Sequence, residues 1–322
     1  MKAAVIESAG LAPRYGEFPE PETSEDRELV SLVAAGIHPV VRALAAGSHY
    51  GSHGLWPAIP GVDAVARTDD GTLIYTGFIA APYGTLAERM AVPHAPRLPL
   101  PTGADPVQVA GGMNPGLSSW MPLNARRDET GSLGTVLVLG ATGTAGILAV
   151  QNAFVLGVTR VIGAGRDPER LAAATAFGAE TLRLTGDRAA DATAIRSALG
   201  DGSPSVVLDF VWGEPAEATF DALLRHSLDE DEGDTAYVEI GSLAGAEASV
   251  PAALLRSTRI RLTGSGAGSA SMAELMRQLP VYLDLIATGA VRVPTSSYAL
   301  SSIEDAWSAA SNAGTRAVVV PD

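Results

Sequence analysis

Three glycines at three-residue intervals mark the stretch of the sequence whose chemistry is easiest to infer. Gly140, Gly143 and Gly146 follow the apolar run Val136–Leu139 and precede an alanine-rich apolar segment. The first glycine would let a strand turn sharply, the second would let the backbone approach a large group, and the third would let a helix lie close to a sheet. The amides at the start of such a helix, together with the helix dipole, stabilise a pyrophosphate. The pattern therefore predicts a dinucleotide site, and the alternative is a tight turn in an α/β protein of another kind.

The whole turn is expected to contact the nucleotide through backbone N–H groups, with hydroxyl donors from its two threonines. Its residues are Gly140, Ala141, Thr142, Gly143, Thr144, Ala145 and Gly146. NAD sites place an acidic residue at the end of the next strand, where it accepts from the ribose 2′-hydroxyl. Here Arg166 stands at that place, and its planar, permanent cation suits a 2′-phosphate. Asp167 is expected to cap the following helix. The sequence therefore predicts NADPH rather than NADH, unless Arg166 is an ordinary surface arginine.

The elements around the glycine turn alternate between short apolar runs and helical periods from about residue 122 onward. The expected strands are 135–139, 160–164, 205–210, 237–240 and 260–263, and the expected helices are 145–156, 168–177, 187–199, 215–226 and 272–285. Alternating units of this size predict a Rossmann-type, doubly wound parallel sheet in an α/β protein.

The remaining parts of the chain are rich in glycine, proline and short apolar runs. Residues 29–35 and 72–76 are expected strands, and 39–46 is one short helix. The tail returns to short strands around a helix at 302–311, and it is expected to complete a mostly β, barrel-like domain. The predicted domains are 1–121 with 288–322, which is β-rich, and 122–287, which is the dinucleotide-binding domain.

Composition excludes several classes of function. The net charge of −14 argues against nucleic acid or an anionic membrane as a partner. The chain has no cysteine, which excludes disulfides, thiolate zinc sites and a cysteine nucleophile. Lys2 is the only lysine, so mechanisms that need an internal lysine are excluded as well. No apolar run reaches the roughly 18–20 residues that span a bilayer, and no secretory signal is evident, so a cytoplasmic location is expected.

Short motifs along nearly the whole chain point to one family. They are Met1-Lys-Ala-Ala-Val5, Ala35-Gly-Ile-His-Pro39, Ile59-Pro-Gly61, Gly84-Thr-Leu-Ala-Glu88 with Val92-Pro93, Gly140–Gly146, Asp209 at a strand end, and Ile240-Gly-Ser242. In these motifs and in the order of its domains the chain resembles the medium-chain dehydrogenase/reductase superfamily, and most of all its zinc-independent quinone oxidoreductase branch. The resemblance implies a GroES-like barrel for the β-rich domain. It also implies reduction of a quinone or an α,β-unsaturated carbonyl by direct hydride transfer from NADPH, in a cleft between the domains.

The sequence departs from the zinc-dependent members of that superfamily. Gly61-Val-Asp63 stands where their Gly-His-Glu motif would stand, and their catalytic cysteines are missing. His49 and His53 share a short loop, but a metal site there would need a third ligand. No metal is therefore expected.

The resemblance implies two candidate catalytic residues. Tyr50 stands in a loop like the family's substrate-facing loop, where its phenol would donate to the acceptor oxygen, and the alternative is an aromatic wall residue. His38 aligns with a polar position that the family turns toward the nicotinamide, and the alternative is a structural histidine.

Further cofactor contacts are expected from four segments. By resemblance, Asn114 and Ser118 approach the nicotinamide and the pyrophosphate, unless they begin a helix in which Ser118 bonds to a backbone carbonyl. Two later segments each follow a predicted strand and so lie at the carboxyl edge of the sheet. These expected contacts are Gly241, Ser242 and Gly264, with Arg316 added as a cation for a cofactor phosphate.

Two rival functions stay open at this stage. One is a zinc-free ketone or alcohol oxidoreductase on the same scaffold, and the other is a non-catalytic NADPH-binding sensor. A homodimer is expected, with an apolar strand at Val250–Leu255 and the segment Arg259–Thr263 offering sheet-edge pairing.

Overall fold

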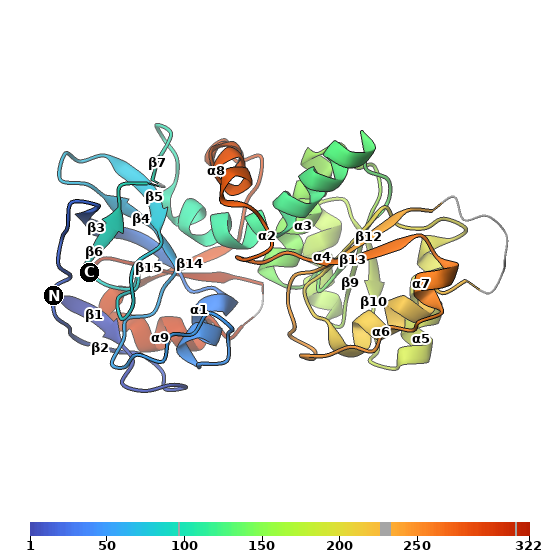
Figure 1. The fold of residues 1–322 in the computed structure, drawn as a ribbon, viewed down its shortest axis with the longest axis horizontal. Coiled ribbons are helices and arrows are strands. Elements are labelled where there is room, and N and C mark those ends of the chain that lie inside the picture. Colours follow the sequence, from blue (N-terminus) through green and yellow to red (C-terminus); the bar gives the residue numbers. More distant parts are fainter. Residues whose placement is uncertain (96, 226–232, 313) are drawn as a thin grey trace. The chain divides into compact units, whose positions relative to one another are not determined.

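The chain forms two compact units. A computed structural model describes residues 1–95, 97–225, 233–312 and 314–322 (Figure 1). Unit 1 is Met1–Pro115 with Leu279–Asp322, and unit 2 is Gly116–Gln278. Both boundaries fall inside helices, namely α2 (Pro106–Thr130) and α8 (Met272–Ala287). The chain therefore passes between the units within continuous helices and not through extended linkers.

Helix α2 is 25 residues long, whereas the sequence suggested only a helix start near Asn114 and Ser118, and only as an alternative. Its middle reads Gly-Gly-Met-Asn-Pro-Gly, and glycine and proline are the poorest helix formers, so they hide the helical period. Its apolar side chains are nevertheless buried, among them Val109, Met113 and Trp120. Tertiary packing of this face outweighs the weak local propensity.

Unit 2 contains a six-stranded parallel sheet, which confirms the predicted Rossmann-type fold. In sheet order its strands are β10 (Glu180–Arg183), β9 (Val161–Gly165), β8 (Val136–Leu139), β11 (Val206–Asp209), β12 (Thr235–Glu239) and β13 (Ile260–Gly264). The direction of winding reverses between β8 and β11. Ligands of doubly wound sheets bind at this switch point, at the carboxyl ends of the strands.

Helices cover both faces of this sheet because successive side chains of each strand point to opposite faces. Val136 and Val138 pack in one core with α3 (Thr144–Val155) and α4 (Pro168–Ala176). Leu137 and Leu139 pack in a second core with residues of α5 (Arg188–Leu199), α6 (Gly213–Leu223) and α7 (Leu254–Ser257). The nearly continuous apolar runs of the buried strands follow from this double coverage.

Three elements of unit 2 differ in detail from the expected ones. Strand β10 was not predicted, because it is an edge strand whose side chains are mostly exposed and polar. The expected strand at Val250–Leu255 is wrong: α7 begins at Leu254, and no strand covers residues 250–253. The predicted helix at 215–226 is confirmed as α6, although residue 226 lies outside the described part of the chain.

Unit 1 is mostly β, as predicted. Its strands are β1 (Lys2–Val5), β2 (Arg14–Glu17), β3 (Arg27–Gly36), β4 (Asp63–Arg67), β5 (Leu73–Gly77), β6 (Arg89–Pro93), β7 (Leu98–Pro99), β14 (Thr295–Ala299) and β15 (Arg316–Val320). Strands β1 and β2 form a hairpin, and the others form one sheet in which only β14 and β15 pair in parallel. Unit 1 also contains the short helices α1 (Pro39–Ala45) and α9 (Ile303–Ala309). Its C-terminal strands join the N-terminal ones because β15 pairs with β3.

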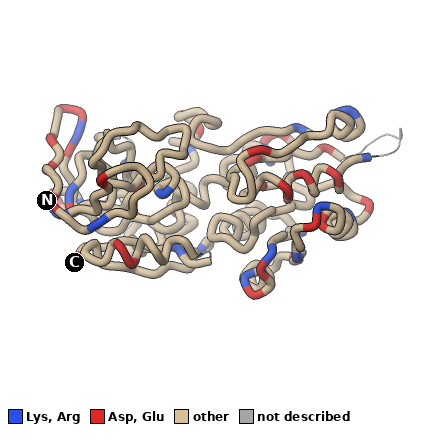
Figure 2. The backbone as a smooth tube through the Cα atoms, turned by 90° about the horizontal axis from the view of Figure 1, so that it is seen from below, with Lys and Arg blue, Asp and Glu red and all other residues tan. Residues whose placement is uncertain are grey.

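Acidic and basic residues are spread along the chain in both units (Figure 2). Within the described ranges, no helix combines the length and the apolar character that crossing a bilayer requires.

Candidate functional site

The glycine turn, residues 140–146, joins β8 to α3 at the switch point. Gly140 has φ +86°, a left-handed conformation that favours glycine, and its N–H donates to the Ala164 carbonyl of β9 (2.9 Å). A Cβ on Gly146 would lie 2.3 Å from the Gly140 carbonyl oxygen. A Cβ on Gly143 would meet only that oxygen, at 3.6 Å. Gly146 is thus needed for packing, whereas the space beside Gly143 is open, as a bound phosphate would require.

The N-terminus of α3 has backbone N–H groups that are available to a ligand. Gly143 is the N-cap, and among the described residues no side chain caps this end. The first helical bond runs from the Ile147 N–H to the Gly143 carbonyl, so the amides of residues 144–146 precede the first helical donor and have no acceptor within the helix. Unpaired amides at a helix start bind anions. The geometry fits a pyrophosphate, and the contacts of Ala141, Thr142, Thr144 and Ala145 with one remain predictions.

The end of β9 carries the residues expected to discriminate the cofactor. Arg166 is exposed directly after the strand. Asp167 caps α4, as predicted: its Oδ1 accepts from the Glu169 N–H (3.0 Å) and the Arg170 N–H (3.2 Å). Its other oxygen lies 3.3 Å from Arg170 Nε. Asp167, the carboxylate that follows Arg166 in the sequence, is therefore committed to the helix. In the described part of the chain Arg166 forms no ion pair, so its cation is available at this strand end.

The other residues predicted in unit 2 lie at the same edge of the sheet. Gly241 and Ser242 follow β12, and Gly264 is the last residue of β13. The Gly241 N–H donates to the Asp209 carbonyl (3.2 Å), at the end of β11. Ser118 lies within α2 rather than at a helix start, and its carbonyl accepts from the Ser265 hydroxyl (2.8 Å). The carboxyl edge thus gathers Gly140, Arg166, Gly241 and Gly264, although they are far apart in sequence.

Four predicted residues lie in unit 1, and two of them are buried together. His38 is 1% exposed and Arg316 is 6% exposed. The Arg316 guanidinium donates to the Ile37 carbonyl (2.9 Å), and burial lowers its pKa to about 10. This placement does not favour the predicted contact of Arg316 with a cofactor phosphate.

His38 belongs to a buried polar cluster with Asp63 and Tyr75. His38 Nε2 lies 3.3 Å from Asp63 Oδ1, and the Tyr75 hydroxyl donates to Asp63 Oδ2 (2.8 Å). Burial is the main cause that lowers the pKa of His38, and burial also raises the pKa of Tyr75. A neutral, enclosed imidazole fits the structural alternative for His38 better than contact with a substrate.

Tyr50 and Asn114 have different surroundings. Tyr50 is 79% exposed in the loop after α1, and its ring lies 4.0 Å from that of His49, centroid to centroid. Asn114 is half-buried in α2. Of the two catalytic candidates, only Tyr50 therefore presents its polar group to an incoming molecule.

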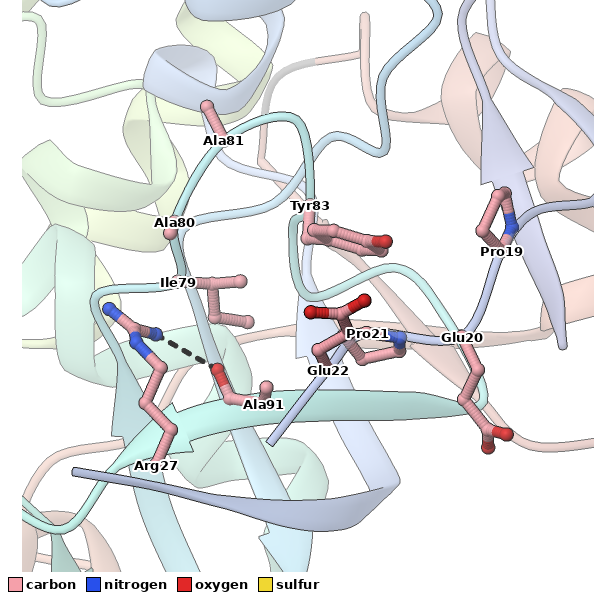
Figure 3. A pocket seen from close by; sticks show the side chains of 10 residues that line it. All are labelled: Pro19, Glu20, Pro21, Glu22, Arg27, Ile79, Ala80, Ala81, Tyr83 and Ala91. Atoms are coloured by element: carbon pink, nitrogen blue, oxygen red, sulfur yellow. Dashed lines mark hydrogen bonds between the residues drawn. The ribbon is translucent and has the colours of Figure 1, made fainter. Parts of the chain in front are cut away.

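Two hollows in unit 1 contain none of the predicted residues. The first has a volume of about 330 Å³ and is drawn in Figure 3. It is lined by Pro19, Glu20, Pro21, Glu22, Arg27, Ile79, Ala80, Ala81, Tyr83 and Ala91. The second, of about 510 Å³, shares Pro19 and Tyr83 with it. The Arg27 guanidinium donates to the Ala91 carbonyl (3.0 Å), which fixes this side chain at the wall of the first hollow. We place the candidate site at the sheet edge, where the amides and Arg166 are, and not in these hollows.

The chain combines a parallel Rossmann sheet, which has a glycine turn at its switch point, with a mostly β unit. These features are typical of nucleotide-binding α/β proteins. The zinc-binding dehydrogenase family matches residues 145–280. A probable NADPH-dependent quinone reductase of Emericella nidulans, tdiC, is 31% identical over the whole of both chains. The chain therefore belongs to the medium-chain dehydrogenase/reductase superfamily, in its quinone oxidoreductase-like branch.

Solved structures show the same fold. The quinone oxidoreductase from Thermus thermophilus, also solved in complex with NADPH, is 26% identical with a TM-score of 0.78, covering 99% of this chain and 100% of that one. A mycobacterial quinone oxidoreductase is 20% identical with a TM-score of 0.81 over the whole of both chains.

The name of the matching family raises the question of zinc. A catalytic zinc site takes three protein ligands. In the described part of the chain, no three His, Cys, Asp or Glu side chains are grouped to hold a metal. His38 and Asp63 are two candidates, but the Arg316 guanidinium already provides a cation that interacts with the Asp63 carboxylate. These residues do not fit a zinc site.

Proposed function

We propose that this protein is an NADPH-dependent reductase of quinones or of α,β-unsaturated carbonyls, working without zinc. The observation that carries the proposal is the glycine turn at the switch point, with the exposed Arg166 at the neighbouring strand end. The names of the Emericella relative and of the Thermus structure support NADPH and a quinone acceptor.

The residues of the turn bind and orient the dinucleotide. Amides of residues 144–146 hold the pyrophosphate, and the open side of Gly143 lets it approach. Arg166 pairs with the 2′-phosphate through its planar fork of donors. Asp167 is occupied as a helix cap, so it does not accept from a ribose hydroxyl as an NAD site would require.

When bound, NADPH supplies the hydride that reduces the acceptor directly. The chain then needs a donor for the acceptor oxygen, where negative charge develops. Tyr50 suits this role because its hydroxyl is exposed, and removing such a donor costs on the order of a hundred- to a thousand-fold in rate. Neither His38 nor Asp63 is free for it, since both are enclosed in unit 1.

The proposal also covers the location, the oligomeric state and the partners of the protein. We propose a cytoplasmic homodimer with small-molecule substrates and no nucleic-acid partner, in keeping with the net charge of −14. Strand β13 is an edge strand of the sheet in unit 2, so its backbone is free to pair with a second copy.

The test is NADPH consumption with a panel of small quinones, enones and ketones, together with a titration of NADPH and NADH. Turnover of quinones or enones, with NADPH bound more tightly than NADH, is the expected result. Turnover of ketones alone would identify a carbonyl reductase, and tight binding without any turnover would identify a sensor. Failure to bind NADPH would refute the proposal as a whole.

A further inference from the structure

Asp209 is the last residue of β11, directly across the switch point from the glycine turn. It is completely buried. Its Oδ1 accepts from the Val211 N–H (2.8 Å) and the Trp212 N–H (2.9 Å), and its Oδ2 accepts from the Tyr237 hydroxyl (2.6 Å). Its carbonyl accepts from the N–H groups of Ile240 (2.7 Å) and Gly241 (3.2 Å). One residue therefore ties the segment after β11 to the segment after β12.

The segment that Asp209 holds, residues 210–213, has an unfavourable backbone. Trp212 has φ +55°, a left-handed conformation that bulky residues rarely adopt, and Gly213 has φ +60°. A conformation of this kind persists only where its surroundings enforce it. The two amides bound by the Asp209 carboxylate lie on either side of Val211, and the second belongs to the peptide unit that leads into Trp212. The carbonyl of that unit, from Val211, accepts from the Ala244 N–H (2.7 Å). The carboxylate is thus the side chain that enforces this turn.

The same segment packs against two glycines of the candidate site. A Cβ on Gly140 would lie 3.0 Å from Val211 Cγ1 and 3.3 Å from Phe210 Cβ. A Cβ on Gly241 would lie 3.0 Å from the Phe210 carbonyl oxygen. Residues 210–213 therefore lie between the glycine turn and the start of the segment after β12. A shift of Phe210 or Val211 would displace both.

We propose that Asp209 is a positioning residue of the dinucleotide site, which holds residues 210–213 in the left-handed turn that sets the places of Gly140 and Gly241. The inference rests on the proposed function, because it assumes that a dinucleotide binds at this edge. Asp209 itself touches no ligand in this account and acts through the backbone of Val211 and Trp212. Tyr237 serves as a second, purely structural partner of the carboxylate, on the side away from these amides.

The test compares NADPH dissociation constants and melting temperatures of the whole protein. Asp209→Ala leaves two amides without their acceptor, and we expect it to weaken NADPH binding about tenfold or more. Tyr237→Phe removes only the hydroxyl partner, so it should lower the melting temperature while NADPH affinity stays within about twofold of wild type. Should Asp209→Ala not fold, Asp209→Ser gives the same comparison with a smaller void.

A rescue variant separates positioning from general destabilisation. Trp212→Gly makes the left-handed conformation intrinsically acceptable, so Asp209→Ala should cost markedly less NADPH affinity in that background than in wild type. The inference would be overturned if Asp209→Ala lost as much NADPH affinity in the Trp212→Gly background as in wild type. It would also be overturned if Tyr237→Phe lost as much NADPH affinity as Asp209→Ala. Wild-type protein that does not bind NADPH would instead refute the proposed function, so the two failures are distinguishable.

Discussion

The Thr142 side chain of the glycine turn packs directly against Gly165 at the end of β9. Thr142 Cγ2 lies 2.5 Å from the position that a Cβ on Gly165 would occupy. The residue just before Arg166 must therefore lack a side chain for the turn to keep its place. This contact links the segment expected to hold the pyrophosphate with the segment expected to hold the 2′-phosphate.

Gly165→Ala should consequently weaken NADPH binding, because its new methyl group pushes Thr142 and with it the turn. Overpacking of this kind typically costs about 1–3 kcal/mol of folding free energy. Thr142→Ser removes the obstructing methyl group, so the double variant should regain most of the lost affinity in a fluorescence titration with NADPH. A double variant no better than Gly165→Ala would show that this contact is not the cause.

Two neighbouring glycines should respond differently to the same substitution. Gly146→Ala places a methyl group 2.3 Å from a backbone oxygen that cannot move aside, so it should lower the melting temperature and abolish NADPH binding. Gly143→Ala makes only an ordinary contact at 3.6 Å, so it should fold normally. It should still lose NADPH affinity, because its methyl group enters the space proposed for the pyrophosphate. Undiminished NADPH binding by Gly143→Ala would place the phosphates elsewhere.

The preference for NADPH should depend on Arg166. Arg166→Ala is expected to raise the dissociation constant of NADPH by roughly ten- to a hundred-fold and to leave that of NADH nearly unchanged, since only the former carries a 2′-phosphate. Arg256→Ala is a matched control, because Arg256 is an exposed arginine of α7, which precedes the amino end of β13. Equal losses for both nucleotides would mean that Arg166 does not read the 2′-phosphate.

His38 should make stability depend on pH. Burial lowers its pKa in the folded protein below the usual value of about 6.5, and the nearby Arg316 cation lowers it further, although Asp63 acts in the opposite direction. The unfolded chain then binds the proton more readily, so the His38 contribution is complete above about pH 6.5 and is lost as pH falls below that value. Through His38 the free energy of unfolding changes by at most about 1.4 kcal/mol per pH unit. Urea unfolding between pH 5 and 8 should show this loss in wild type, and the His38→Asn variant should lack this part of it.

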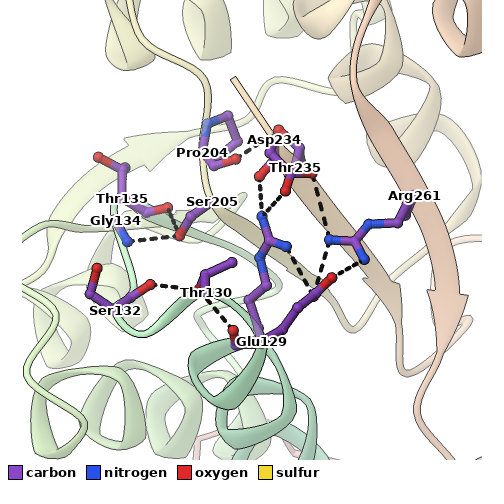
Figure 4. Close-up of polar contacts among 11 residues, drawn as sticks. Glu129, Thr130, Ser132, Gly134, Thr135, Pro204, Ser205, Asp234, Thr235 and Arg261 are labelled. Atoms are coloured by element: carbon purple, nitrogen blue, oxygen red, sulfur yellow. Dashed lines mark hydrogen bonds and ion pairs between the residues drawn. The ribbon is translucent and has the colours of Figure 1, made fainter. Parts of the chain in front are cut away.

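A cluster at the amino edge of the sheet in unit 2 should govern stability without touching the cofactor. Arg126 is 4% exposed, and its guanidinium lies 3.0 Å from Glu129 and from Asp234. Arg261 also pairs with Glu129 but is half exposed (Figure 4). Arg126→Ala should therefore destabilise by about 2 kcal/mol, because it leaves a void at a buried position and removes the bonds of the guanidinium to Glu129 and Asp234. Arg261→Ala should change stability little. NADPH affinity should be unaffected in both, and a clear loss in either would contradict this assignment.

Much of unit 2 was predictable because its signals are local. The alternation of apolar runs with helical periods, the Asp167–Pro168 helix start and the glycine turn each lie within a few consecutive residues, and the structure confirms these elements. Errors arose where local signals were weak or misleading. Helix α2 contains Gly111, Gly112 and Pro115, and the apolar residues near Val250 pack beneath the sheet without forming a strand.

The sequence by itself determined which residues have the chemistry to bind a nucleotide: the glycines at 140–146 and the cation at 166. Only the tertiary structure decided that Asp209, on the other side of the glycine turn from Arg166, ties two distant loops to that turn, and that His38 and Arg316 are enclosed in unit 1. The physical reason is that backbone conformation and helix starts depend on neighbouring residues, whereas strand order and burial depend on pairings between residues far apart in the sequence, such as Val136 with Val206 at the switch point.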